Sequence, residues 1–143
     1  MKRLLAALLL LAGPSHAASL PRYVAGPLSG FDLECKQAGQ RSPAIVSEIP
    51  DLDGDGSPDH IIETGKSCAA VKLLYCNAEG CLIDIFLSTF SGNAGGYHAK
   101  RVRVVQGKPA LLEVVADGPA CGKPAGQDCI SRYAWDKDEF KPR

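Results

Sequence analysis

The stretch Ala44-Ile-Val-Ser-Glu-Ile-Pro-Asp-Leu-Asp-Gly-Asp-Gly-Ser-Pro-Asp-His-Ile-Ile-Glu-Thr64 joins two short apolar segments through an acidic loop that contains two glycines. The segments 44–49 and 60–64 are rich in Ile, Val and Thr, which favour strands. Pro50 ends the first segment, because proline has no N–H to donate to a sheet. An EF-hand would need a helix on each side of its loop, and these flanks are short and β-branched. We therefore expect two antiparallel strands joined by the loop 51–59.

The loop 51–59, called the acidic loop below, has the residue spacing of a calcium loop. Oxygen-bearing residues occupy its first, third, fifth, seventh and ninth positions and glycine the sixth: Asp51, Asp53, Asp55, Ser57, Asp59 and Gly56. Carboxylates this close together repel one another unless a cation lies among them. A metal-free Asp-Gly turn is the alternative, but such a turn gives no reason for Asp51 or Asp59. The pattern therefore predicts a metal site.

We expect the ion to be one calcium, because every ligand is an oxygen and a flexible loop suits about six to eight ligands better than a strict octahedron. The predicted ligands are the side chains of Asp51, Asp53 and Asp55, the backbone carbonyl of Ser57, and the carboxylate of Asp59, directly or through water. An EF-hand has a bidentate Glu at position twelve, where this chain has Ile62, and Glu63 comes one residue late. We therefore expect weak binding, about 10⁻⁵ to 10⁻³ M, and a structural ion that does not act as a switch.

The segment Leu52-Asp-Gly-Asp-Gly-Ser-Pro-Asp-His-Ile-Ile62 resembles the D-x-[DN]-G-D-G-x-x-D-[hydrophobic]-x-[hydrophobic] core of FG-GAP and VCBS repeats, in which a calcium loop links two strands of a propeller blade. The resemblance implies the same ligands, Asp51, Asp53, Asp55, Ser57 and Asp59. It covers about twenty residues and occurs once, in a chain too short for a propeller, so it implies the site and not the fold. The layout is also similar to that of small secreted bacterial proteins with one such loop, a Cys-rich middle and an aromatic last strand.

The first 17 residues have the anatomy of a secretory signal peptide. Lys2 and Arg3 form a basic region, the apolar run 4–12 is too short to span a bilayer, and Ser15-His-Ala17 resembles a cleavage site. No later apolar run reaches membrane-spanning length. We expect cleavage near Ala17 and a protein that is secreted or periplasmic.

The composition argues against nucleic acid as a partner. Lys and Arg number 16, as do Asp and Glu, and loss of Lys2 and Arg3 leaves a mature charge of about −2. No basic cluster is present to neutralise phosphates or an anionic membrane surface. The mature chain, about 126 residues, is the length of one domain.

All six cysteines follow the leader, and an even number in an exported chain predicts a disulfide framework. The chain has neither a C-x-x-C pair nor zinc-ligand spacing. Proximity in sequence favours Cys76–Cys81 and Cys121–Cys129, which leaves Cys35–Cys68 by subtraction.

The rest of the chain predicts an all-β fold, an antiparallel meander or small sandwich of about six to eight short strands stapled by disulfides. We expect an extended arm over 18–30 and a single β domain over 31–143. Strands are predicted at 31–35, 44–49, 60–64, 81–90, 98–105, 109–116 and 130–135, with Phe140 closing the core. The segment 67–75 is compatible with a short helix or with irregular chain.

These features favour a calcium-stabilised domain that is not an enzyme and binds an extracytoplasmic protein or a cell-wall component. One alternative is an inhibitor of an extracytoplasmic hydrolase, which would present the Gly/Pro-rich loop 116–128 to its target. Another is a calcium-dependent hydrolase that uses Asp59 and His60, although no nucleophile is defined beside them. The sequence contains no recognised catalytic motif, and we assign no catalytic residue.

Overall fold

The computed structural model describes residues 19–90 and 92–143, so the predicted leader 1–17 lies outside the described residues. The helices are α1 (Arg22–Gln37) and α2 (Ala69–Tyr75), with short 3₁₀ turns η1 (Thr64–Lys66) and η2 (Gly118–Cys121). The strands are β1 (Val46–Ile49), β2 (Asp59–Glu63), β3 (Cys76–Asn77), β4 (Gly80–Phe86), β5 (Gly95–Ala99), β6 (Arg101–Val105), β7 (Leu111–Asp117), β8 (Asp128–Asp136) and β9 (Glu139–Pro142). No described helix is long and apolar enough to cross a membrane.

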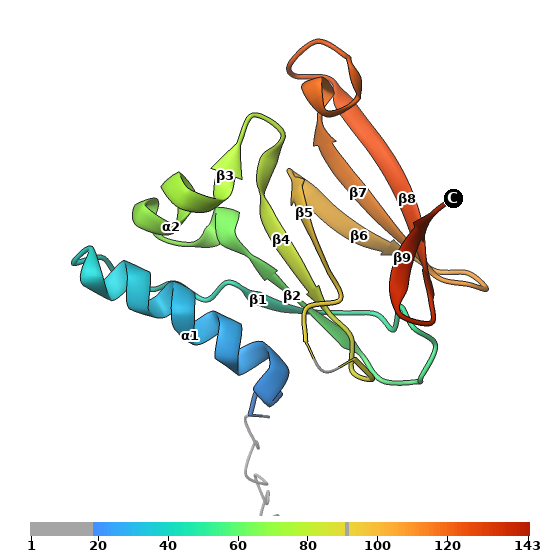
Figure 1. The fold of residues 1–143 in the computed structure, drawn as a ribbon, viewed down its shortest axis with the longest axis horizontal. Coiled ribbons are helices and arrows are strands. Elements are labelled where there is room, and N and C mark those ends of the chain that lie inside the picture. Colours follow the sequence, from blue (N-terminus) through green and yellow to red (C-terminus); the bar gives the residue numbers. More distant parts are fainter. Residues whose placement is uncertain (1–18, 91) are drawn as a thin grey trace, which may run out of the picture.

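The strands form two antiparallel sheets (Figure 1). The first sheet has the order β1-β2-β4, with β3 and β5 also paired to β4, and the second has the order β6-β7-β8-β9. Only Lys100 separates β5 from β6, so the chain passes from one sheet to the other within a single residue. All observed pairings are antiparallel, as the sequence predicts.

The first sheet is covered on both faces. Alternation along its strands sends Ile62 and Phe86 toward the helices, where they pack with Val24, Phe31 and Val71. The opposite face packs against the second sheet, through a cluster that includes Leu52, Ile61, Ile83, Ile85, Leu87, Leu112 and Val114. The molecule therefore has three layers, helices on a first sheet on a second sheet.

Aromatic side chains close the core between the sheets. Trp135 meets Phe90 and Phe140 edge to face, with ring centroids 5.6 and 5.0 Å apart. Tyr97 of β5 packs on Tyr133 of β8 with centroids 5.1 Å apart. Burial, with a smaller effect of Tyr133, raises the pKa of Tyr97 to about 12. The prediction that Phe140 closes the core is confirmed.

The all-β prediction is wrong at the N-terminus. Residues 22–37 form helix α1, where the sequence predicts an extended arm over 18–30 and a strand over 31–35. The helix contains Pro27, and both Gly26 and Gly30, which all disfavour helix. It forms because Val24, Phe31 and Cys35 lie on one face and are buried against the first sheet, and this burial outweighs the unfavourable propensities.

The predicted helix, strands and disulfides in the rest of the chain are observed, although some strands begin or end at other residues. Of the two alternatives for 67–75, the helix is observed as α2. The predicted strand 81–90 ends at Phe86, and the predicted strand 98–105 is divided at Lys100 between β5 and β6. The three predicted disulfides, Cys35–Cys68, Cys76–Cys81 and Cys121–Cys129, are all present. The first ties α1 to the start of α2.

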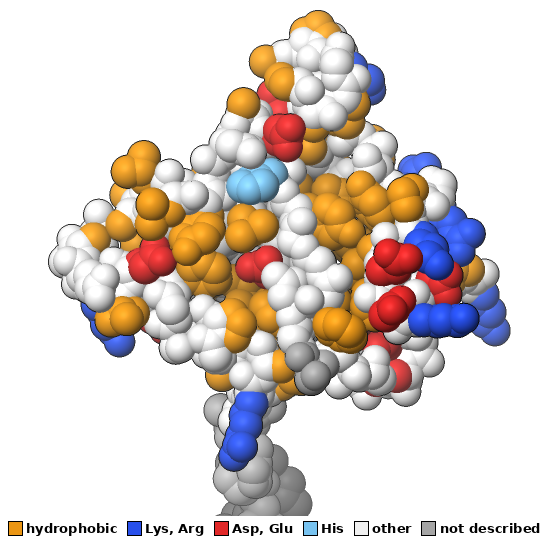
Figure 2. Space-filling model, in the orientation of Figure 1, with side chains coloured by type: hydrophobic (Ala, Val, Ile, Leu, Met, Phe, Trp, Pro, Cys, Tyr) orange, Lys and Arg blue, Asp and Glu red, His pale blue; other side chains and the backbone are white. Residues whose placement is uncertain are grey.

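Charged side chains are unevenly distributed on the face drawn in Figure 2. Acidic and basic groups gather at the right-hand margin, in the region of β9, and hydrophobic side chains are frequent over the centre. Near β9, Lys141 pairs with Asp136 at 2.7 Å and with Glu139 at 3.6 Å. These pairs are exposed, so each contributes little to stability.

Candidate metal centre

The acidic loop brings three of its aspartates together. Asp51, Asp53 and Asp59 each offer a carboxylate oxygen, and these atoms all lie within 4.8 Å of one another. The register of β1 and β2 pairs Ile49 with Asp59, so the two ends of the loop are held opposite each other. The hairpin therefore brings together side chains that are up to eight positions apart in sequence.

The backbone of the loop turns inward around Asp51. The N–H groups of Gly54 and Gly56 donate to the two Asp51 oxygens at 2.7 and 2.8 Å. The pKa of Asp51 is lowered, chiefly by the hydrogen bond from Gly56. Both glycines have positive φ, 81° and 90°, a conformation that other residues adopt only with strain. The two Asp-Gly pairs are therefore required by the shape of the loop.

Asp59 is the buried member of the cluster. Its side chain is fully buried and accepts the N–H of Leu52 at 2.7 Å and the N–H of Ser88 at 2.9 Å. Burial nevertheless raises the pKa of Asp59 to about 6, because its effect is larger than the lowering by these two hydrogen bonds. The negative charges of nearby Asp53 and Asp51 raise the pKa further. The carboxyl group of Asp59 is therefore harder to ionise than a free aspartate.

The β4–β5 connection also contacts the acidic loop, which the sequence did not reveal. The hydroxyl of Thr89 donates to Asp53, and the hydroxyl of Ser88 donates to Asp55. The signal available in the sequence was the pair of hydroxyl residues directly after the buried strand β4. Two connections distant in sequence are thus joined at the cluster.

Asp55 and Ser57 lie at the margin of the site. Both are exposed, and Asp55 is not in the group of three carboxylates. Within the loop, the Ser57 N–H donates to Asp55 at 2.7 Å, and the Asp55 N–H donates to Asp53 at 3.2 Å. The structure therefore brings together three of the four predicted carboxylate ligands, and the Ser57 carbonyl stays a prediction.

The aspartates lack a basic partner. Within residues 19–90 and 92–143, no ion pair joins Asp51, Asp53, Asp55 or Asp59 to Lys, Arg or His. A cavity of about 450 Å³, lined in part by Asp51, Asp53 and Trp135, gives solvent access to the cluster. The cluster is thus open to solvent, and its carboxylate oxygens are the type of ligand that calcium and magnesium ions prefer.

Asp59 and His60 lie on opposite faces of β2. Neighbours in a strand point to opposite faces of the sheet, so His60 faces the helices, where its ring lies 6.4 Å from that of Tyr23. Asp59 is instead held by backbone N–H groups on the other side. The geometry thus gives no support to a hydrolase built on these two residues.

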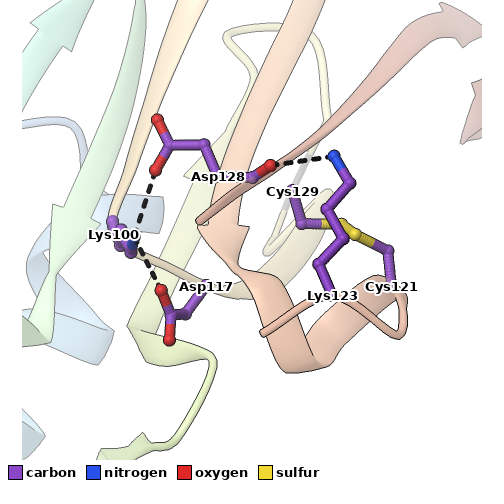
Figure 3. The surroundings of a disulfide bond; sticks show 6 residues. All are labelled: Lys100, Asp117, Cys121, Lys123, Asp128 and Cys129. Atoms are coloured by element: carbon purple, nitrogen blue, oxygen red, sulfur yellow. Dashed lines mark hydrogen bonds and ion pairs between the residues drawn. A yellow bond between two sulfur atoms is a disulfide. The ribbon is translucent and has the colours of Figure 1, made fainter. Parts of the chain in front are cut away.

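A second acid-containing loop, residues 117–129, is called the braced loop below (Figure 3). Lys100 bridges its two ends, with Nζ 2.7 Å from Asp117 and 3.0 Å from Asp128. Lys123 donates to the Asp128 carbonyl at 3.1 Å, and the Cys121–Cys129 disulfide links the loop to β8. Residues 119–128 are exposed, so this loop is held rigidly at the surface.

Comparison with known proteins identifies no relative: no family model, no curated protein and no solved structure matches the chain. The resemblance of the acidic loop to FG-GAP and VCBS repeats therefore stays an expectation based on the loop residues alone.

Proposed function

We propose that this protein is a secreted or periplasmic binding domain, not an enzyme, whose fold is stabilised by one calcium ion in the acidic loop. The observation that carries the proposal is the convergence of Asp51, Asp53 and Asp59 within 4.8 Å around a fully buried carboxylate, with no basic side chain paired to them in the described part of the chain. A divalent cation would offset this repulsion.

The proposed ligands are Asp51, Asp53 and Asp59, together with Asp55 and the backbone carbonyl of Ser57. Glu63, the one nearby Glu that follows the loop, pairs with Lys66 and accepts from the Ser47 hydroxyl at 3.4 Å. It is therefore engaged elsewhere and does not complete an EF-hand ligand set. This supports weak affinity, in the range of about 10⁻⁵ to 10⁻³ M, which is adequate outside the cell.

The proposed role of the ion is structural. Ser88 and Thr89 already link the β4–β5 connection to the acidic loop through Asp55 and Asp53. A cation among the carboxylates would hold the β1–β2 loop against this connection. It would thereby fix one end of the first sheet and would not open or close a surface.

Calcium titration tests the proposal. We expect isothermal titration calorimetry of the mature protein to give one site, and calcium to raise the melting temperature more than the same concentration of magnesium. Asp53→Asn removes one charge from the cluster and should abolish most of the effect. Asp138→Asn removes one charge from an exposed turn and is the matched control. Absence of both heat and thermal shift at several millimolar calcium would refute the proposal.

Export and partner binding are the remaining parts of the proposal. Three disulfides fit an oxidising compartment, and the predicted leader supplies the route. Cell fractionation with a C-terminal epitope tag tests this, because a protein found only in the cytoplasm with reduced cysteines would contradict it. The proposed partner is an extracytoplasmic protein or a cell-wall component.

One observation supports hydrolase inhibition as a second candidate. The braced loop is exposed along its tip and held by a disulfide and by Lys100, and a rigid exposed loop loses little entropy on binding. Inhibition assays against a panel of extracytoplasmic proteases and glycosidases test it. Reversal of any inhibition by Lys123→Glu at the tip would assign the activity to this loop.

A further inference from the structure

Strand β1 is the edge strand of the first sheet in the described part of the chain. Among the described residues it pairs only with β2, and the Glu63 N–H donates to the Ile45 carbonyl at 2.9 Å. In antiparallel pairing, residues bonded to the neighbouring strand alternate with residues whose N–H and C=O point away from it. The N–H and C=O groups of Val46 and Glu48 therefore point outward, and an unpaired edge of this kind can accept another strand.

A groove lies beside this edge on the helix-covered face of the sheet. Its volume is about 620 Å³, and we call it the β1 groove. Helix α1 contributes Leu28 and Asp32, the strands contribute Val46, Glu48 and His60, and Leu20, which is 40 % exposed, lies in the segment before α1. Val46 and Glu48 share a face because they are two positions apart in a strand. A strand added to β1 would therefore send alternate side chains into the groove.

The charge of the β1 groove is one-sided. Asp32 and Glu48 line it, and no Lys or Arg does. Asp32 accepts the Ser42 hydroxyl at 2.7 Å, and Glu48 has no hydrogen bond or ion pair within the described ranges. The Nδ1 atom of His60 is buried there, with no hydrogen-bond partner among residues 19–90 and 92–143. The groove thus combines apolar walls with unpaired polar groups, and its carboxylates complement a basic side chain.

A second copy of the chain is a poor occupant. Pairing of two β1 strands across a twofold axis would bring both Glu48 side chains to one interface, together with both Asp32 side chains, and like charges at an interface disfavour association. The occupant must therefore carry positive charge where this chain is negative.

We infer that the β1 groove binds an extended peptide segment of another protein, which adds a strand to β1 and directs a Lys or Arg side chain toward Asp32 and Glu48. Backbone hydrogen bonds to Val46 and Glu48 provide affinity, and the groove selects the alternate side chains. This gives a partner class to the binding role proposed above, and it does not depend on calcium.

The test uses synthetic heptapeptides, acetylated and amidated, of the pattern Thr-X-Thr-Lys-Thr-X-Thr, in which X is Val, Leu or Phe. On a strand, X, Lys and X face one side, so they enter the groove together. The expected result is saturable binding to the mature protein by NMR titration. Replacing the peptide Lys with Glu should weaken binding at least about ten-fold, because it places like charges together. Methylating the two backbone nitrogens that face β1 should abolish binding.

Protein variants locate the site. Glu48→Lys should weaken binding of the Lys peptide about ten-fold and improve binding of the Glu peptide. Asp138→Lys makes the same charge change on the exposed β8–β9 turn and should alter affinity less than about two-fold, because exposed charges at that distance are screened by salt. Melting temperatures of both variants confirm that they are folded.

Amide hydrogen exchange distinguishes strand addition from surface attachment. Bound peptide should slow exchange at Val46 and Glu48, whose N–H groups are free, with little change at Ser47, whose N–H already faces β2. The inference is overturned if no peptide binds at about 1 mM, if Glu48→Lys has the same affinity as Asp138→Lys, or if these two amides are not protected. Self-association of the free protein through these amides would also overturn it.

Each measurement is made once in calcium and once in a calcium chelator. Binding in both conditions supports the peptide site whatever the result of the calcium titration. Calcium binding without peptide binding would leave the metal centre in place and refute this inference alone.

Discussion

The acidic loop and the braced loop both hold close carboxylates, but they compensate the charge in different ways. The braced loop, whose ribbon is at the top of Figure 1, has Lys100 between Asp117 and Asp128 and a disulfide beside them (Figure 3). The aspartates of the acidic loop, among the described residues, accept hydrogen bonds from backbone N–H groups and from the hydroxyls of the β4–β5 connection, with no Lys or Arg paired to them. The braced loop is complete with the chain's own residues. We therefore expect an added cation to stabilise the acidic loop more than the braced loop.

The largest effect is expected from removal of the buried carboxylate of the acidic loop. In calcium-containing buffer, Asp59→Ala should lower the free energy of unfolding by about 3 kcal/mol or more, because the N–H groups of Leu52 and Ser88 lose their acceptor at about 1–3 kcal/mol each. Chemical denaturation measures this. Asp138→Ala, on an exposed turn, should change stability by less than about 0.5 kcal/mol. Equal effects of the two substitutions would mean that Asp59 is not structural.

Calcium should stabilise the protein through the acidic loop and not through the braced loop. At a calcium concentration of about 100 times the dissociation constant, ligand binding to the folded state adds about 2.7 kcal/mol to the free energy of unfolding. Asp53→Asn should lose most of this gain. Lys123→Ala, in the braced loop, should keep it. Denaturant curves with and without calcium provide the measurement, and a calcium effect that survives in Asp53→Asn would place the ion elsewhere.

Breaking the covalent brace should have a comparable but calcium-independent cost. The Cys121→Ser, Cys129→Ser double variant should lose about 2–3 kcal/mol of the free energy of unfolding. Without the disulfide, the loop between these residues, which are 8 positions apart, is no longer closed in the unfolded state, and the unfolded chain gains entropy. Its response to calcium should be unchanged. Loss of the calcium response in this variant would show that the two loops are coupled through the sheets.

Without calcium, pH should act on the acidic loop through Asp59. Burial raises its pKa from the ordinary 3.8 to about 6, so between about pH 4 and pH 6 the folded state binds more protons than the unfolded state. Stability should therefore fall as the pH rises through this interval, and saturating calcium should remove the fall. Melting temperatures in a chelator across this range test the sign, and an increase with pH would contradict it.

The braced loop should show the opposite and smallest response. Hydrogen bonds from Lys100 are the largest cause of the lowered pKa values of Asp117 and Asp128. Such carboxylates stabilise the fold above their unfolded pKa, and this contribution is lost as the pH falls through the folded value, below about pH 4. Lys100→Gln should reduce that acid loss and leave the calcium response intact. If stability falls equally below about pH 4 in this variant and in the unaltered protein, the ion pairs of Lys100 with Asp117 and Asp128 do not contribute to stability.

The sequence predicted the parts of the molecule that depend on local pattern. The β1–β2 hairpin follows from two β-branched segments around Asp-Gly turns, and Cys76–Cys81 follows from proximity. Asp51, Asp53 and Asp59 converge because the hairpin register brings Asp59 opposite Ile49. These features need only neighbouring residues, so periodicity and spacing are sufficient to find them.

The sequence failed where distant contacts decide the structure. Alternation over 31–35 resembled a strand, but Val24, Leu28, Phe31 and Cys35 also recur at helical spacing, which was the signal for α1. Gly26 and Pro27 obscured it, and burial against the first sheet determined the outcome. Ser88 and Thr89 were missed at the candidate metal centre for the same reason, since only the tertiary fold brings them to Asp55 and Asp53.

The single-residue crossing at Lys100 limits how the chain can be divided. Ala99 pairs with Cys81 in the first sheet, and Arg101 pairs with Val115 in the second. A fragment that ends before Lys100 would expose the apolar face of the first sheet, and a fragment that begins there would lack the surface on which its own strands pack. Neither sheet is an independent module, so fragments made for expression or engineering must keep both sheets together.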